Sequence, residues 1–117
     1  MIYPITPIGK PRMTGRPGSA HTPAAKRYWA YKDEVRYRRV QIPESGYHIT
    51  FHIPMAKSWS KKKKLAMDGQ PHQQTPDKDN LEKALLDAIF DDDSNIWDGR
   101  VTKLWAREGA IQVELIK

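Results

Sequence analysis

The sequence predicts a single small domain of the α+β class, with a mixed sheet of about four strands and two main helices. Three observations lead to this class. The chain has 117 residues, which suits one domain, and no internal repeat divides it. Two segments show helical spacing of apolar residues, and four short segments indicate strands between turn residues. The domain is therefore expected to span residues 1–117.

The two predicted helices cover residues 23–39 and 80–90. Thr22 can cap the first helix through its hydroxyl, and Pro23 loses nothing at a first helical position. In the second helix, apolar residues recur every three to four positions. The side chains expected to face the core are Tyr28, Tyr31 and Val35 in the first helix and Leu81, Leu85 and Ile89 in the second.

Four segments of alternating or proline-broken apolar sequence are predicted strands: residues 1–7, 47–53, 101–107 and 111–116. The first is short and broken by proline, which suits the edge of a sheet. In the second, His48 and His52 share the polar face. They would lie about 13 Å apart along a strand, too far to chelate one ion, so we interpret them as solvated.

The composition narrows the class of protein. Hydrophobic residues make up 38% of the chain and charged residues 29%, so the core is thin, and a dimer interface or a bound metal can supplement it. There is no cysteine, which leaves oxygen or imidazole ligands for any metal. No apolar run is long enough for a membrane span and the first residues lack a secretory pattern, so we expect a cytoplasmic protein without membrane contact.

Charge is distributed unevenly along the chain. Residues 1–75 carry 14 basic and 4 acidic side chains, whereas residues 76–98 carry 2 basic and 8 acidic ones. A basic surface attracts polyanions, so nucleic acid is the predicted partner. Residues 55–76 are expected to form a mobile basic loop with at most one helical turn, because like-charged lysines repel one another. The residues expected to contact phosphates are Arg12, Lys61, Lys62, Lys63, Lys64, Arg100 and Lys103.

The acidic segment contains a pattern that suits a metal site. If the backbone stays extended from Asp77 through Asp79, the two carboxylates point to the same side just ahead of the second helix. Paired like charges destabilise each other unless a cation lies between them, and oxygen ligands suit Mg²⁺ or Mn²⁺. The alternative is that one aspartate caps the helix and the other favours its dipole.

Three further residues extend this hypothesis. Lys83 follows Asp79 by four positions, so with a metal at Asp79 it would be positioned on the helix to reach a scissile phosphate. Asp87 follows Lys83 by four more, and the three side chains could equally form a surface row of ion pairs. Asp98 is the predicted third carboxylate, since it lies between the acidic loop and a strand; the aspartates at 91–93 are the alternatives.

The acidic segment resembles the RusA-type Holliday junction resolvases. The motif that carries the resemblance is Pro76-Asp77-Lys78-Asp79-Asn80-Leu81-Glu82-Lys83, followed by Leu86-Asp87-Ala88 and by Asp98 before Val101. A weaker likeness at residues 9–12, 22–23 and 58–63 extends it over most of the chain. The sequence departs from the family near the third acid, where Trp97 replaces the first of two aspartates and Arg100 replaces a glutamine.

This resemblance implies a small homodimeric endonuclease that uses Mg²⁺ to resolve four-way DNA junctions. We expect it to be nucleoid-associated, in a bacterial or phage context. It implies that Asp77, Asp79 and Asp98 bind the metal and that Lys83 is the functional lysine. Asn80 and Asp87 are expected to support them. A homodimer suits this substrate, because two symmetry-related sites can nick two strands of a symmetric junction.

The sequence therefore predicts a RusA-like fold and a Mg²⁺-dependent, structure-selective DNA endonuclease acting in recombination and repair. A rival from another class is a non-catalytic DNA- or RNA-binding protein, whose acidic segment only balances charge. A third interpretation is a subunit whose acids dock a basic partner protein.

Overall fold

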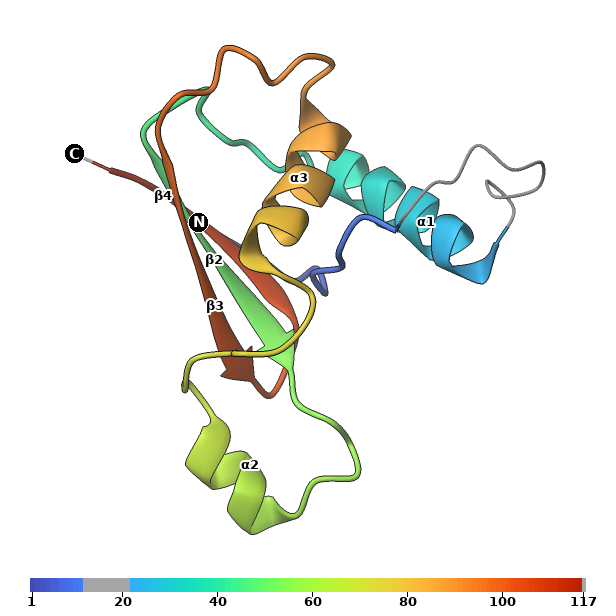
Figure 1. The fold of residues 1–117 in the computed structure, drawn as a ribbon, viewed down its shortest axis with the longest axis vertical. Coiled ribbons are helices and arrows are strands. Elements are labelled where there is room, and N and C mark those ends of the chain that lie inside the picture. Colours follow the sequence, from blue (N-terminus) through green and yellow to red (C-terminus); the bar gives the residue numbers. More distant parts are fainter. Residues whose placement is uncertain (12–21, 117) are drawn as a thin grey trace.

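A mixed four-stranded sheet forms the centre of the structure, a computed structural model that describes residues 1–11 and 22–116 (Figure 1). Its strands lie in the order β1 (Ile2–Tyr3), β4 (Ala110–Leu115), β2 (Tyr47–Pro54) and β3 (Gly99–Ala106). The pair β2 and β3 is parallel, and the other two pairs are antiparallel. The predicted α+β class with a mixed sheet is confirmed, and β1 is the expected edge strand.

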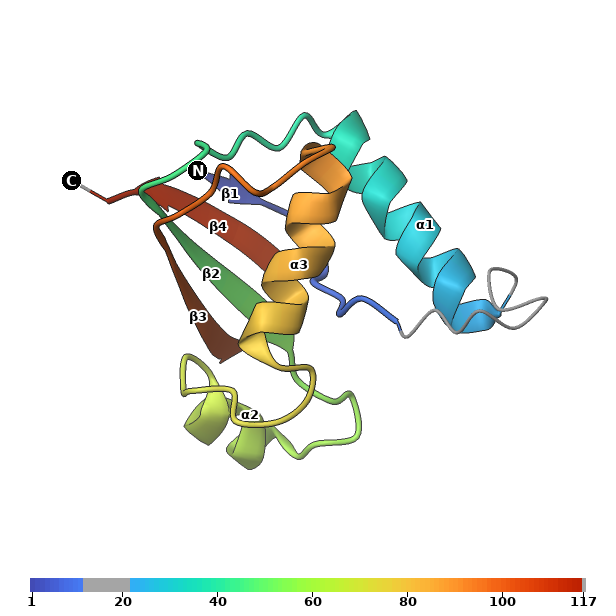
Figure 2. The same ribbon diagram turned by 45° about the horizontal axis from the view of Figure 1, so that its top comes forward.

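Two helices cover one face of the sheet. The helix α3 (Lys78–Ile89) lies across the strands, and α1 (Pro23–Tyr37) packs beside it (Figures 1 and 2). Parallel strands need a crossover connection, and α3 supplies it between β2 and β3. Thr22 Oγ1 accepts the N–H of Ala25 at 3.1 Å and so caps α1 as predicted. No helix of the described residues is long and apolar enough to cross a membrane.

The core lies between this helical layer and the sheet. Its buried side chains include Tyr28, Tyr31, Val35, Leu81 and Leu85, as predicted, together with Tyr47, Ile49 and Phe51 of β2. On the other face of the sheet, His48 Nε2 lies 2.9 Å from Thr102 Oγ1 and His52 Nε2 lies 3.1 Å from Gln112 Oε1. The two histidines are therefore partly covered and hydrogen-bonded across strands rather than simply solvated.

The basic segment that was predicted to be a loop contains a helix, α2 (Lys61–Met67). Ser60 caps it, because its Oγ accepts the N–H of Lys63 at 3.2 Å. The Lys63 ammonium lies 4.0 Å from the centre of the Trp59 ring, which packs on Trp105 of β3 with ring centres 4.9 Å apart. These contacts offset the repulsion between lysines on which the loop prediction rested.

The chain that leaves α2 covers the edge of β3. The N–H of Gly69 donates to Trp105 O at 2.8 Å, the N–H of Trp105 to Gln70 O at 2.9 Å, and the N–H of His72 to Lys103 O at 3.0 Å. His72 is buried against the Trp105 ring, with ring centres 4.4 Å apart. Burial, together with the nearby Lys103 ammonium, lowers the pKa of His72. A neutral ring therefore helps to fasten this segment to the sheet.

Candidate active site

The acidic motif lies at the start of α3, which begins two residues earlier than predicted. Asp77 is the N-cap residue, with an extended backbone (φ −65°, ψ 152°), whereas Asp79 already belongs to the first helical turn. The extended geometry predicted for both aspartates is therefore wrong, because only Asp77 precedes the helix. Both side chains are exposed.

Asp77 occupies the capping position without capping the helix. Its side chain makes no capping hydrogen bond, whereas Asp79 Oδ1 accepts the N–H of Asn80 at 3.1 Å. The alternative in which a capping role explains the acid is therefore wrong for Asp77. Its carboxylate is not used to close the helix end and is available to a cation.

The loop before Asp77 is fastened by Lys103 of β3. Lys103 Nζ donates to Gln74 O at 2.7 Å and to Pro76 O at 2.8 Å, and the second of these carbonyls belongs to the peptide that joins Pro76 to Asp77. The ammonium group that was predicted to contact phosphates is therefore occupied by two backbone carbonyls. Lys103 fixes where the acidic motif begins.

A hollow of about 560 Å³ lies beside Asp77. Its walls come from the N-terminal segment, the first turn of α1 and the start of α3, and they include Gly9 and Lys10. A Cβ atom at Gly9 would lie 2.6 Å from Asn80 Nδ2 and 2.9 Å from Pro76 Cβ. The absence of a side chain at Gly9 thus lets the N-terminal segment pack directly on the acidic motif.

Asp98 lies just before β3 and lines a second hollow, of about 320 Å³, together with Lys83 and Glu82 of α3. Lys83 follows Asp79 by about one helical turn, or roughly 6 Å along the axis. Lys83 and Asp98 thus line the same hollow, whereas Asp79 lies one turn of α3 away from Lys83. Within residues 1–11 and 22–116, no group of three or more acidic or histidine side chains is arranged to hold a metal ion.

Asp87 pairs with the N-terminal segment rather than with Lys83. Asp87 Oδ2 lies 2.6 Å from Lys10 Nζ and accepts the hydroxyl of Tyr28 at 2.9 Å. Burial acts to raise the pKa of Asp87, but the bonds from Lys10 and Tyr28 outweigh it and hold this pKa below its ordinary value. The alternative of a row of ion pairs along α3 is therefore wrong, since the ion pairs of the described residues do not include Lys83.

Glu82 and Tyr47 belong to the site but were not predicted. The Tyr47 hydroxyl donates to Glu82 Oε2 at 2.6 Å, and burial and this bond raise the pKa of Tyr47, so the hydroxyl keeps its proton. Gly99 lies against the Tyr47 ring, which a Cβ atom there would overlap. The available signal was the spacing of Asp79 and Glu82, because residues three apart share a helix face.

The predicted phosphate-contacting residues lie in separate places. The four lysines at 61–64 are the first residues of α2, and this helix lies beyond the ends of β2 and β3 (Figure 1). Arg100 is exposed on β3. Arg12 lies outside the described residues. Those members of the set that the structure describes therefore do not lie together on the acidic motif.

Comparison with known proteins identifies the class and then the family. A family model described as "Endodeoxyribonuclease RusA" matches residues 3–116, so the protein is by class a DNA endonuclease. The chain belongs to the RusA family, and the resemblance in its acidic motif is confirmed. No curated protein and no solved structure matches it.

Family membership defines the general activity. RusA-family proteins are endonucleases that resolve Holliday junctions in recombination, and they therefore bind branched DNA. They generally depend on a divalent metal ion, and the family is of phage or bacterial origin. The single α+β domain with its mixed sheet is consistent with the RusA fold.

Proposed function

We propose that this protein is a Mg²⁺-dependent, structure-selective endonuclease that cleaves four-way DNA junctions in recombination and repair, with Mn²⁺ as a substitute ion. The observation that carries the proposal is the RusA family match over residues 3–116, which includes the whole acidic motif at the start of α3. The proposed setting is the cytoplasm and nucleoid of a bacterium, or of a bacterium carrying a phage.

In this proposal Asp77, Asp79 and Asp98 hold the metal ion. Their oxygen donors suit a hard cation, and the Asp77 carboxylate is not used to cap α3. The proposal requires the three carboxylates to converge, which they do not do as a group in the described residues. A bound ion would activate a water molecule and offset charge on the phosphate.

Lys83 is proposed to stabilise the negative charge that builds up on the scissile phosphate. It is exposed, lies one turn along α3 from Asp79, and lines the same hollow as Asp98. A positioned ammonium group lowers the barrier only if it meets charge that develops in the transition state. Asn80 supports the motif by packing against Gly9, and Asp87 supports it by holding Lys10.

DNA is proposed to be held through phosphate contacts by residues outside the metal site. These contacts predict steep salt dependence and little direct reading of base sequence. A homodimer would present two such sites to the two strands that must be cut. Of the seven residues predicted for these contacts, Arg12, Lys61, Lys64 and Arg100 are proposed here. Lys103 is held by two backbone carbonyls, Lys63 lies over the Trp59 ring, and Lys62 does not line the hollow beside Met55.

The decisive test compares Asp79→Asn with the wild type on a labelled four-way junction during a Mg²⁺ titration. We expect cleavage by the variant to fall at least about 1,000-fold while junction binding survives, because the amide loses the charge that holds the ion. Asp33→Asn, at an exposed acid of α1, is the matched control and should cleave normally. A linear duplex of the same length tests selectivity for the junction.

Each rival has its own outcome in this experiment. Wild-type protein that binds the junction independently of metal and yields no product is a non-catalytic nucleic-acid-binding protein. Weak binding of any DNA even at low salt would favour a subunit that docks a basic partner. Mg²⁺-dependent cleavage that persists in Asp79→Asn would end the catalytic assignment.

A further inference from the structure

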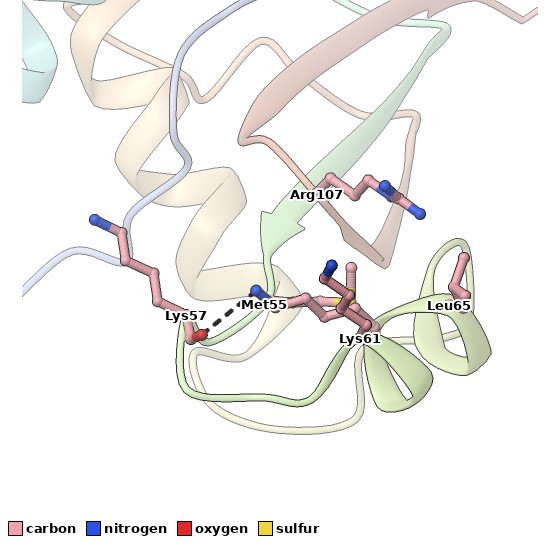
Figure 3. A pocket seen from close by; sticks show the side chains of 6 residues that line it. Met55, Lys57, Lys61, Leu65 and Arg107 are labelled. Carbon is pink, nitrogen blue, oxygen red and sulfur yellow. Dashed lines mark hydrogen bonds between the residues drawn. The ribbon is translucent and has the colours of Figure 1, made fainter.

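We propose that the hollow between α2 and the end of β3 is a second DNA site, which binds a backbone phosphate and its deoxyribose away from the acidic motif. The proposal rests on the proposed function for the identity of its ligand as DNA. The hollow measures about 480 Å³, within the roughly 300–1,000 Å³ of ligand pockets. The residues that line it are Met55, Lys57, Lys61, Lys64, Leu65 and Arg107 (Figure 3).

The lining is cationic. Four of its six residues are lysine or arginine, and none of the described residues that line it is acidic. Figure 3 shows the Lys57 ammonium pointing away from Lys61 and Arg107, and Lys57 instead contributes its carbonyl, which accepts Lys64 Nζ at 3.4 Å. Three cations, on Lys61, Lys64 and Arg107, are therefore left to meet an anion.

Helical spacing selects which lysines of the run belong to this hollow. Lys61, Lys64 and Leu65 stand at positions i, i+3 and i+4 of α2, which share one helix face. Lys63 lies over the Trp59 ring and serves the packing of α2. Lys62 lines no part of the hollow. The four consecutive lysines therefore point to different surroundings, and only Lys61 and Lys64 line the hollow.

The hollow also has an apolar floor, formed by Met55 and Leu65. Met55 is buried, and its N–H donates to Ala106 O at 2.9 Å, which fixes it to the end of β3. Leu65 is 67% exposed, and with Met55 it offers apolar area to a ligand. Cations beside an apolar floor fit one nucleotide unit of a DNA backbone, with its phosphate on the ammonium groups and its sugar on the floor.

Arg107 can supply directed hydrogen bonds to the phosphate. Its Nε lies 3.7 Å from Asp68 Oδ2, and both side chains are exposed, so this ion pair is weak. Several other N–H donors of the guanidinium stay available, and their planar arrangement matches two phosphate oxygens. Asp68 does not line the hollow, so the charge that faces a ligand is positive.

The test compares Lys61→Gln with Lys62→Gln, two neighbouring exposed lysines of which only the first lines the hollow. Binding of a labelled four-way junction is measured from 50 to about 300 mM salt with EDTA present, so cleavage does not interfere. We expect Lys61→Gln and Arg107→Gln each to weaken binding about five- to tenfold and to reduce the slope of log affinity against log salt by about one. Lys62→Gln should change the affinity less than about twofold.

Cleavage kinetics separate this site from the acidic one. With Mg²⁺, Lys61→Gln should raise the junction concentration needed for half-maximal cleavage without changing the rate at saturation. Binding that depends on Lys61 in a protein that never cleaves would overturn the proposed function and keep this site. Equal losses in Lys61→Gln and Lys62→Gln would overturn the site, since α2 would then add only diffuse charge. Unchanged DNA binding in Lys61→Gln, with lost binding of poly-glutamate, would assign the hollow to an acidic protein instead and overturn the proposal.

Discussion

The acidic residues at the two ends of α3 differ in what surrounds them. Near the end of the helix, Asp87 is held by the Lys10 ammonium and the Tyr28 hydroxyl, which depress its pKa. At the start, Asp77 is exposed and makes no capping hydrogen bond. The difference shows that the charge count of this segment does not identify a functional acid. The partners of each carboxylate separate those that serve the fold from those available to an ion.

Among the changes that compare the two ends of α3, the largest expected effect is on Asp77. Asp77→Asn should reduce Mg²⁺-dependent junction cleavage at least about 100-fold, or about 2.7 kcal/mol, because the amide cannot hold the ion as a carboxylate does. Its melting temperature should stay within about 1 °C of the wild type, since the side chain makes no capping bond. Single-turnover cleavage and thermal unfolding measure the two effects. A large loss of stability would mean that Asp77 serves the fold, as Asp87 does.

The next effect concerns the anchor of the Asp77 loop. Lys103→Met should lower the free energy of unfolding by about 2 kcal/mol, because the carbonyls of Gln74 and Pro76 lose a charged donor. Urea unfolding measures this change. Arg100→Met, on an exposed residue of the same strand, is the matched control and should leave stability within about 0.5 kcal/mol. Equal stability of the two variants would contradict the anchoring role.

A smaller effect is expected at the opposite end of α3. Asp87→Asn should lower the free energy of unfolding by about 1 kcal/mol, because it weakens the bonds to Lys10 and Tyr28 at a partly exposed position. Asp33→Asn should leave stability unchanged. If Asp87 serves the fold and Asp77 serves the metal site, the Asp87→Asn variant should keep most of its cleavage rate at temperatures where it is folded. A loss of cleavage as large as that of Asp77→Asn would erase the distinction.

The smallest effect is a dependence on pH. The pKa of Asp87 is lower in the folded protein than its ordinary value near 4, so this carboxylate stabilises the fold fully above that value. The contribution is lost as the pH falls through the folded pKa. The difference in unfolding free energy between the wild type and Asp87→Asn should therefore be constant above about pH 5 and shrink below about pH 4. A difference that grows on acidification would contradict the assigned ion pair.

Local patterns predicted most of the fold. The helical spacing of Tyr28, Tyr31 and Val35 and the alternation along β2 both place buried residues correctly. The extent of helix α2 was underestimated because repulsion between lysines is visible in the sequence, whereas the contact of Trp59 with Trp105 is not. Packing between segments more than forty residues apart decided that element.

The candidate site was predicted less completely, for the same reason. The motif itself is readable, but the start of α3 at Lys78 changes the relation of its two aspartates. The partner of Asp87 is Lys10, which lies 77 positions away in the sequence, so helical spacing alone offered only Lys83 as a possible partner. The bond between Tyr47 and Glu82 also joins distant segments. The spacing in the sequence identifies the acidic residues, but only the fold shows which of them are already paired with other side chains.

The segment at residues 69–72 limits how two copies of this chain could meet. It hydrogen-bonds along β3, so that border of the sheet offers few unpaired backbone groups to a neighbour. The other border, β1, is only two residues long. Growth of a continuous intermolecular sheet is therefore blocked on one side and minimal on the other. Among the described residues, the surfaces left for contact between two protomers include the helices and the face of the sheet that carries His48 and His52.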